Sequence, residues 1–439
     1  MSTVKLIARF TWEKRILYAP GMAVFFALFL FSMLLNLSVS YMGNTNEAVA
    51  REIISRYWAL ILLQSGKVLL VYLVIGGFWG TVFSLGLLEC RQVFVALKSR
   101  YSIPLLSGML VFLVALLKFF ETIILHPQLF IENFASHAKL FETILDALAG
   151  NTSPYIFSIP MYFLFVTGAA GAIVFTVRNG AARPVIHRMR FLLRNKKIVA
   201  AGVIIAAGMA LFRIAGVCNR HETAHPNILI ISSDAVRPDH LGVNGYFRDT
   251  SPNIDAIARN SMQIRGMMTT VPRTFPSWVS ILTSQYPLSH NIRHMFPRSR
   301  ERNAVFDSAC RPLSGLGYLT GVVSDFAGDI FPRIDLGFEK VLAPTLSFPV
   351  LIRQIILEKQ TFLLPFLTCR MGWFLFPEMR GIAKYSQHGR VTDETIDLIR
   401  TRGSRPFFIT AFYSVTHFPF AAPYPYYKWY SRPDYRGPY

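Results

Sequence analysis

Apolar positions follow two different patterns along this chain, and the change comes near residue 218. Before it they form long uninterrupted runs; after it they form short runs separated by turns and charged residues. About 20 apolar residues are enough for a helix to cross a bilayer. Five runs approach that length, and we expect spans near residues 20–41, 58–88, 104–125, 154–176 and 198–217. The pattern predicts an α-helical membrane region over 1–217 and a globular α/β domain over 218–439.

Charges between the runs indicate a topology. The stretch before the first run and the second-to-third and fourth-to-fifth connections are rich in Lys and Arg, whereas the other two connections are neutral or acidic. This alternation is what the positive-inside rule requires for five spans with the N-terminus in the cytoplasm. The first run lacks a small-residue cleavage site, so we interpret it as a retained span. We expect an integral protein of a bacterial inner membrane whose globular domain is periplasmic or extracellular.

Composition supports a membrane protein. The 439 residues are 52% hydrophobic and 16% charged, and the mean hydropathy is +0.38. These values are more apolar than is typical of soluble domains. The net charge of +20 lies largely in the predicted cytoplasmic connections, and no nucleic-acid-binding motif accompanies it. We therefore expect the lipid bilayer, and no nucleic acid, as a partner.

Four charged residues interrupt or end the apolar runs, namely Lys67, Lys118, Glu121 and Arg213. Charge inside a bilayer is costly, so each needs a reason. One interpretation is snorkelling side chains together with a Lys118–Glu121 pair. The other is a docking site for an anionic lipid head group.

The cysteines show no metal-binding spacing; they are Cys90, Cys218, Cys310 and Cys369. Cys310 and Cys369 would share an oxidising compartment and are candidates for a disulfide. The alternative is two isolated thiols.

The globular domain begins with a short apolar run over 227–232, which suits a strand buried on both faces of a parallel sheet. It ends at Ser233 and Asp234. Ligands of open α/β sheets bind at the carboxyl ends of the strands, so Asp234 is well placed to hold a cation. Further strands are expected within 317–325 and 405–420, the second ending near His417.

Two helices are expected between these strands. Residues 250–264 have Ser251 or Asn253 as a cap and an apolar face with Ile254 and Ile257. A second helix follows Thr274, which lies at or just before its N-terminus, where free N–H groups and the helix dipole favour an anion. Thr274 is either an N-cap or a nucleophile.

A further apolar stretch, "FLLPFLTCRMGWFLF" (362–376), is short for a span and is broken by Pro365 and Arg370. Three placements remain open for it. It lies against the membrane surface, it covers the site, or it packs as an insertion on the core of the globular domain.

Four segments together carry a resemblance: "HPNILIISSDAVRPDHLGVNGY" (225–246), "TSPNIDAIARNS" (250–261), "TFPSWVSILTSQYPLSHNI" (274–292) and "RPFFITAFYSVTHFPF" (405–420). They resemble the N-terminal part of the sulfatase family, within the alkaline-phosphatase superfamily. Five spans before such a domain are also similar to the bacterial phosphoethanolamine transferases. The resemblance implies an alkaline-phosphatase-like α/β domain, incomplete at its C-terminal end.

The family transfers a sulfate or phosphate group through a metal-bound nucleophile, and this implies roles for four residues. Asp234 matches a metal-ligating carboxylate and Thr274 the nucleophile, which also contacts the metal. His417 matches the histidine that assists the leaving group or contacts the ester, and His290 a position with a structural role. Oxygen ligands suit Ca²⁺, Mg²⁺ or Mn²⁺, and added histidines would favour Zn²⁺.

The chain departs from sulfatases in ways that shape the expected activity. Sulfatases need a Cys or Ser in a Cys/Ser-x-Pro-x-Arg setting, whereas this chain has Thr274 and Trp278. We therefore expect hydrolysis or transfer of a phospho-ester of a lipid or envelope glycan, with sulfuric ester hydrolysis as the alternative. The later Asp-His-Gly motif is not found, and we interpret the chain as a piece of a longer protein. The remaining alternative is a truncated, non-catalytic pseudo-enzyme that binds a ligand.

Overall fold

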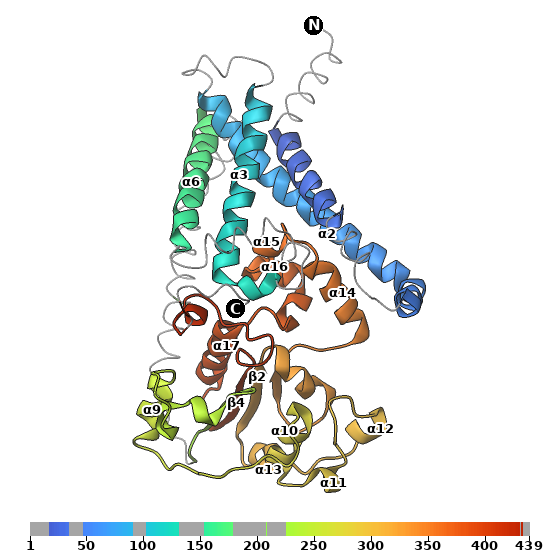
Figure 1. Ribbon diagram of the computed structural model, residues 1–439, viewed down its shortest axis with the longest axis vertical. Helices are drawn as coiled ribbons and strands as arrows, with labels where there is room; N and C mark the ends of the chain where they lie inside the picture. The colour runs from blue at the N-terminus through green and yellow to red at the C-terminus, as the bar shows by residue number, and fades with distance from the viewer. Residues whose placement is uncertain are drawn as a thin grey trace. The chain divides into compact units, whose positions relative to one another are not determined.

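The structure is a computed structural model that describes residues 17–34, 47–90, 102–130, 153–178, 208, 225–430 and 432 (Figure 1). It divides into two compact units. The first, which we call the helical unit, comprises Met1–Met209, Phe348–Pro377 and Pro423–Tyr439. The second, which we call the α/β unit, comprises Ala210–Ser347 and Glu378–Ala422.

Among the described residues, four long apolar helices form the frame of the helical unit. They are the helix Leu17–Leu34, α2 (Glu47–Cys90), α3 (Ser102–Leu125) and α6 (Tyr155–Arg178). Each is long and apolar enough to cross a membrane. Helices are thus present at four of the five expected spans. The fifth, near 198–217, lies outside the described residues except for position 208, as do most of the charged connections used to predict the topology.

Small residues and one kink set the packing of these helices. A Cβ added at Gly21 would lie 2.8 Å from the Cα of Gly80, and one added at Gly171 would lie 2.9 Å from the Cα of Gly86. Such close approach is typical of helix pairs in membranes. Non-helical angles at Tyr57 (φ −120°, ψ 17°) kink α2, and this kink coincides with the expected start of the second span.

The charged residues in these helices have partners inside the unit. Lys118 Nζ lies 2.7 Å from Glu121 Oε2, and the hydroxyl of Ser158 donates to Glu121 Oε1 at 2.7 Å. The expected Lys118–Glu121 pair is confirmed. Lys67 donates to the carbonyl of Leu375, and Arg213 lies outside the described residues.

The α/β unit contains a four-stranded parallel sheet with strand order β1-β4-β2-β3. Its strands are β1 (Ile228–Ser233), β2 (Leu319–Ser324), β3 (Lys340–Leu342) and β4 (Phe407–Tyr413). Ser233 is paired with Tyr413, and Ser324 with Phe412. The carboxyl ends of three strands therefore meet at one edge, as the apolar runs predicted.

The remaining helices are shorter. The α-helices are α9 (Pro252–Ala258), α10 (Thr274–Thr283), α11 (Pro287–His290), α12 (Ser299–Arg302), α13 (Cys310–Gly315), α14 (Phe348–Glu358), α15 (Leu364–Leu367), α16 (Arg370–Leu375) and α17 (His388–Thr401). The 3₁₀ turns are η2 (Pro127–Phe130), η3 (Pro238–His240), η4 (Gly242–Asn244), η5 (Phe326–Arg333), η6 (Pro377–Gly381) and η7 (Tyr426–Lys428).

Two expectations for the first elements of the α/β unit are wrong. β1 is not buried on both faces, since Leu229 is 43% and Ile231 69% exposed within the described part of the chain. The reason is that β1 lies at the edge of the sheet, a position that an apolar run does not reveal. The first helix is also shorter than the expected 250–264, and Ile254 and Ile257 on its apolar face are exposed.

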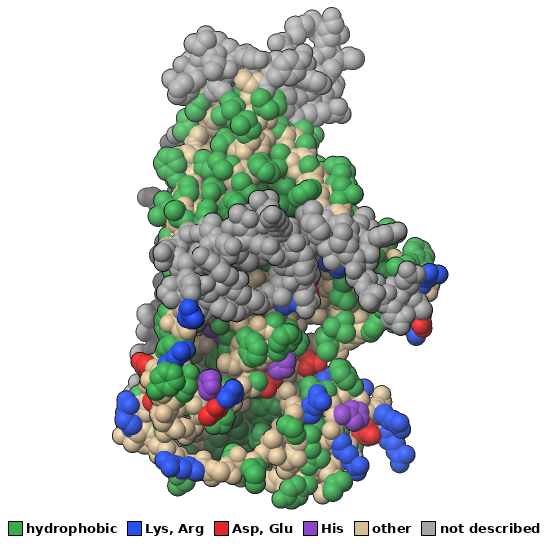
Figure 2. All heavy atoms as spheres, viewed as in Figure 1, with side chains coloured by type: hydrophobic (Ala, Val, Ile, Leu, Met, Phe, Trp, Pro, Cys, Tyr) green, Lys and Arg blue, Asp and Glu red, His purple; other side chains and the backbone are tan. Residues whose placement is uncertain are grey.

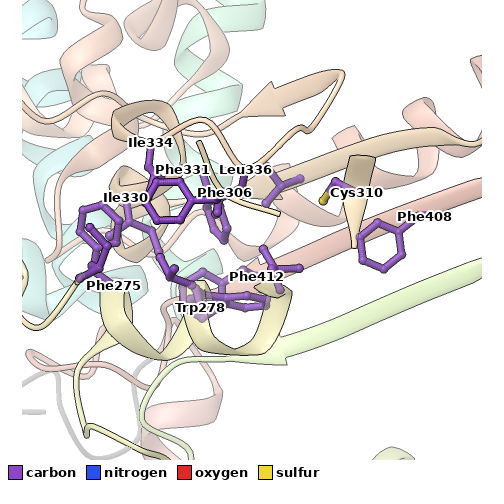
Figure 3. Packing of buried hydrophobic residues seen from close by; sticks show 14 of the residues in the cluster. Phe275, Trp278, Phe306, Cys310, Ile330, Phe331, Ile334, Leu336, Phe408 and Phe412 are labelled. Carbon is purple, nitrogen blue, oxygen red and sulfur yellow. The ribbon is translucent and has the colours of Figure 1, made fainter. Parts of the chain in front are cut away.

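An aromatic cluster holds α10 against the sheet (Figure 3). The ring of Trp278 lies 5.4 Å from that of Phe331 and 5.1 Å from that of Phe412 on β4. Phe275, the second residue of α10, is fully buried in the same cluster. Large buried aromatic rings with defined mutual geometry fix a helix firmly. The cluster therefore determines where the first turn of α10 lies at the edge of the sheet.

The possible disulfide between Cys310 and Cys369 is absent, because both thiols are free. Cys310 is buried in the core of the α/β unit, where burial raises the pKa of its thiol to about 11. Cys369 is exposed in the helical unit. The alternative of isolated thiols holds for these two, and Cys218 lies outside the described residues.

The apolar stretch after β3 belongs to the helical unit rather than to the core of the α/β unit. Within the helical unit, α14 packs against α2, and α15 packs against α3 (Figure 1). Hydrophobic side chains cover much of the visible surface of the apolar helices, whereas charged side chains gather on the α/β unit (Figure 2). Of the three placements left open for residues 362–376, an insertion packed on the core of the globular domain is therefore wrong.

Candidate active site

Asp234 and Thr274 meet at the carboxyl edge of the sheet. The hydroxyl of Thr274 donates to Asp234 Oδ2 at 3.2 Å, although the residues are 40 positions apart. Thr274 is the first residue of α10, and Arg273 occupies the N-cap with extended angles (φ −145°, ψ 135°). Thr274 is therefore not an N-cap, because its hydroxyl contacts a carboxylate from another element instead of capping its own helix.

The turn that carries Asp234 is tied to the end of β4. The Asp234 N–H donates to the carbonyl of Tyr413 at 2.8 Å, and the hydroxyl of Thr416 donates to the carbonyl of Asp234. Ser233 Oγ lies 2.8 Å from the Thr416 hydroxyl. Ala235 follows with φ 59°, a left-handed conformation that is uncommon for alanine and that recurs where a functional site constrains the backbone.

His417 lies on the loop after β4, three residues beyond Ser414. Its backbone N–H donates to the Ser414 carbonyl at 2.9 Å, and its Nδ1 lies 2.6 Å from the carbonyl oxygen of Phe418. A carbonyl can only accept, so Nδ1 carries the hydrogen and Nε2 of the neutral ring has a free lone pair. The ring also contacts Phe326 at 5.6 Å between centroids. Within the described contacts, His417 does not touch Asp234 or Thr274.

His290 is buried between α10 and the residues that follow α11. Its Nδ1 accepts from the Ile292 N–H at 3.1 Å, so Nε2 carries the hydrogen and donates to the Ser280 hydroxyl at 3.0 Å. Burial lowers the pKa of His290 and favours this neutral form. Both ring nitrogens are thus used to link two segments of the fold, which agrees with a structural role.

Sequence reasoning missed Asp325, a buried carboxylate that directly follows β2. Its Oδ1 accepts from the N–H of Ser414 at 2.9 Å and from the hydroxyl of Ser414 at 2.7 Å, and its Oδ2 accepts from the Gln387 N–H at 3.3 Å. Asp325 therefore holds the start of the loop that bears His417. The signal that singled out Asp234, a carboxylate just after a buried strand, would also have found it.

A buried ion pair supports the first turn of α10. Arg333 lies 3.1 Å from Asp329, and its guanidinium lies 5.0 Å from the ring centre of Phe275. Burial raises the pKa of Asp329 to about 6, and the charge of Arg333 opposes this shift. Arg333 of this ion pair thus packs against Phe275, the residue that follows Thr274.

The Asp234–Thr274 pair fits part of a metal site. Carboxylate and hydroxyl oxygens are donors that Ca²⁺, Mg²⁺ and Mn²⁺ prefer, and two oxygens 3.2 Å apart are close enough to share one cation. Among the residues that the structure describes, however, no group of three or more His, Cys, Asp or Glu side chains is arranged to hold a metal ion. The pair would supply two ligands of such a cation.

Comparison with known proteins gives a family match for the part of the chain that begins just before β1. Residues 226–437 match the family described as Sulfatase. The chain is 28% identical over 138 residues to an N-acetylgalactosamine-6-O-sulfatase of Bacteroides thetaiotaomicron, a match that covers 28% of this chain and 27% of that protein. It is 40% identical over 65 residues to an arylsulfatase of Clostridium perfringens, covering 15% of this chain and 14% of that protein.

The chain thus spans only a small part of the relatives that it matches. No solved structure matches it significantly. Apart from His225, the four segments quoted in the sequence analysis lie within the matched residues. Residues 226–437 are a sulfatase-family domain.

Proposed function

We propose that this chain belongs to a membrane-anchored ester hydrolase or group transferase in which Thr274 attacks a phospho-ester of a lipid or envelope glycan. The observation that carries the proposal is the 3.2 Å hydrogen bond from Thr274 to Asp234 at the edge of the sheet. The sulfatase-family domain supports the hydrolase class. The four apolar helices support a substrate at the membrane.

The side chains suit nucleophilic attack. Asp234 accepts the hydrogen bond of the Thr274 hydroxyl and so orients its oxygen, and a carboxylate in this position can also take up the proton. α10 begins at Thr274, so its first N–H groups and its dipole favour the anionic ester group in front of the hydroxyl.

A divalent cation and His417 complete the proposed chemistry. When bound by Asp234 and Thr274, the cation would lower the pKa of the hydroxyl and offset charge on the ester oxygens. The Phe418 carbonyl holds Nδ1 of His417, which leaves Nε2 to bind a proton and deliver it to the leaving oxygen. Thr416 and Asp325 position the loops that carry these groups.

Sulfuric ester hydrolysis is the second candidate, because both relatives are named as sulfatases. It is the weaker candidate, since sulfatases convert a cysteine or serine to formylglycine and threonine does not undergo this conversion. The substrate, the acceptor and the outward orientation in a bacterial inner membrane are parts of the same proposal.

The test uses the chain purified in detergent, with Ca²⁺, Mg²⁺, Mn²⁺ or Zn²⁺ added singly. Turnover is compared for bis(p-nitrophenyl) phosphate, p-nitrophenyl phosphate and p-nitrophenyl sulfate. Thr274→Ala is expected to lower phosphodiester turnover by on the order of a thousandfold, and Asp234→Asn to raise the metal concentration needed. Thr283→Ala is the matched control, because Thr283 lies at the other end of α10 and donates to the Val279 carbonyl at 2.6 Å.

The outcomes separate the candidates. Faster turnover of the sulfate than of the phosphate esters would favour the second function. Unchanged activity in Thr274→Ala would contradict a threonine nucleophile. If no ester is cleaved while a ligand still binds, the non-catalytic pseudo-enzyme is the better description.

A further inference from the structure

Residues Phe348–Pro377, which we call the insertion, leave the α/β unit after β3 and join the helical unit. They contact three different apolar helices. Ring centroids lie 5.6 Å apart for Phe366 and Phe25, 5.2 Å for Phe362 and Phe119, and 5.2 Å for Phe348 and Tyr57. Contacts with three helices show that the insertion packs among them rather than against one side.

The contacts run far along the apolar helices. Phe348 lies at the Tyr57 kink of α2, whereas the fully buried Leu363 contacts Tyr72 through its backbone. A rise of about 1.5 Å per residue places Tyr72 about 22 Å beyond Tyr57 along the helix. Phe25, which contacts Phe366, lies in the middle of Leu17–Leu34. The insertion thus reaches parts of these helices that a bilayer would surround.

The insertion also provides partners for a charge within α2. Lys67 Nζ donates to the Leu375 carbonyl and lies 4.4 Å from the ring centre of Phe376. A lysine in an apolar span needs such partners, because lipid tails offer none. Lys67 therefore has partners inside the protein.

The outward side of the insertion is apolar as well. α14 places Phe348, Leu351 and Ile355 on an exposed face while Ile352 and Leu357 are buried. The exposed positions of α14 are therefore all apolar, although Gln354 is among its buried residues. An apolar exposed face does not suit water, but it does suit a position between protein and lipid. α16 also exposes Met371 and Phe374, together with Arg370 at its first position.

We propose that the insertion is a re-entrant part of the membrane domain, and that its exposed apolar face contacts the acyl chains of the bilayer. Its continuity with the spanning helices identifies the bilayer as the partner of that face. Much of the backbone is satisfied internally, since α14, α15 and α16 form their own hydrogen bonds, and Gln360, Thr361 and Leu363 between α14 and α15 are buried. The proposal does not depend on the chemistry of Thr274.

Fluorescent labelling of single cysteines tests this in the full chain. Cys90, Cys218 and Cys369 are changed to serine, and Cys310 is kept because it is fully buried. An NBD label is then attached in Phe374→Cys and Ile355→Cys. Phe247→Cys and Ile257→Cys of the α/β unit are matched controls, since Phe374 and Phe247 are both 82% exposed and both isoleucines are exposed.

Each protein is reconstituted into phosphatidylcholine–phosphatidylglycerol vesicles with or without doxyl-labelled lipid, and iodide is the aqueous quencher. We expect doxyl lipid to reduce the fluorescence of the two insertion labels about twofold or more while iodide has little effect, as for other groups buried in the acyl region. The two control labels should show the reverse. The proposal is overturned if the insertion labels respond like the controls. It is also overturned if neither quencher reaches them, since a second protein copy would then cover this face.

Discussion

α14 and α17 are helices of 11 and 14 residues that belong to different units and expose opposite kinds of side chain. α17 buries Val391 and Leu398 against the sheet and exposes a polar face with Thr392, Asp393, Asp397 and Arg400. α14 buries Ile352 and Leu357 but exposes Phe348, Leu351 and Ile355. The first pattern is that of a helix between a core and water. The second pattern suits a helix between protein and lipid, as the proposal for the insertion requires.

The largest expected effect in testing this contrast comes from truncating one buried leucine in the α/β unit and one in the insertion. Leu398 fills the space over Gly321, whose added Cβ would lie 2.6 Å from it, so Leu398→Ala should lower the unfolding free energy of the α/β unit by about 2–5 kcal/mol. Leu363→Ala in the insertion should cost less, because lipid is as apolar as leucine and only packing is lost. Hydrogen exchange of each unit during unfolding in nanodiscs measures both. Equal costs would indicate that the insertion folds against water.

A pH dependence confined to the α/β unit should be the next largest effect. Burial raises the pKa of Asp329 from 3.8 to about 6, so the folded protein binds more protons than the unfolded chain within this range. The unfolding free energy should therefore fall as pH rises through this window, by at most about 3 kcal/mol. Asp329→Asn should remove the slope.

The control residue for that experiment is Asp335, whose pKa is shifted in the opposite direction. The Gly337 N–H and Arg311 lower the pKa of Asp335, so its stabilising effect is lost as pH falls, not as it rises. Asp335→Asn should therefore leave the slope assigned to Asp329 in place. Thermal unfolding followed at pH 4 to 7 checks both variants, and an unchanged slope in Asp329→Asn would contradict the assignment.

Two glycines offer a smaller but well-matched contrast. A Cβ at Gly372 would lie 2.6 Å from the Cα and carbonyl oxygen of Leu367, whereas a Cβ at Gly389 would meet nothing within 4 Å. Gly372→Ala should destabilise the helical unit by about 1–3 kcal/mol through overpacking. Gly389→Ala should stabilise α17 by about 0.5 kcal/mol. Melting temperatures in nanodiscs test the pair, and a neutral Gly372→Ala would contradict close packing of α15 and α16.

The smallest effect should come from charges on the exposed faces. Ile396 lies on the water-facing side of α17, so Ile396→Lys should change stability by no more than about 0.5 kcal/mol. Ile355→Lys on α14 should be tolerated in detergent but should lower the yield of folded protein in membranes, because the lysine must then enter lipid or distort it. Equal yields of the two variants in membranes would remove the contrast.

Much of the fold could be predicted because its signals are local. The apolar runs located four helices. The short runs over 227–232 and 317–325 located β1 and β2, each of which pairs in parallel with β4. The error at β1 has a physical cause. A central strand and an edge strand can share one apolar pattern, and only the neighbouring elements decide which face is covered.

The candidate site, too, could be predicted from the sequence only in part. A carboxylate after one strand and a hydroxyl at a helix start were both visible, and the structure brings Asp234 and Thr274 to 3.2 Å. Their catalytic and metal-binding roles, and that of His417, stay predictions. Thr416 was missed because what matters is the carbonyl that it binds on another element, not its own spacing. Asp325, in contrast, has the same local signal as Asp234, because it directly follows a buried strand.

What the sequence by itself determined is the kind of environment that each segment requires, because hydrophobic period and run length report on nearest neighbours and on solvent. Only the tertiary structure decided that residues 348–377 pack with helices from the first 130 residues, and that Asp325 holds Ser414. These contacts join residues about 90 to 340 positions apart. No local period encodes such distances, because the contacts depend on which surfaces remain uncovered after the helices and strands have formed.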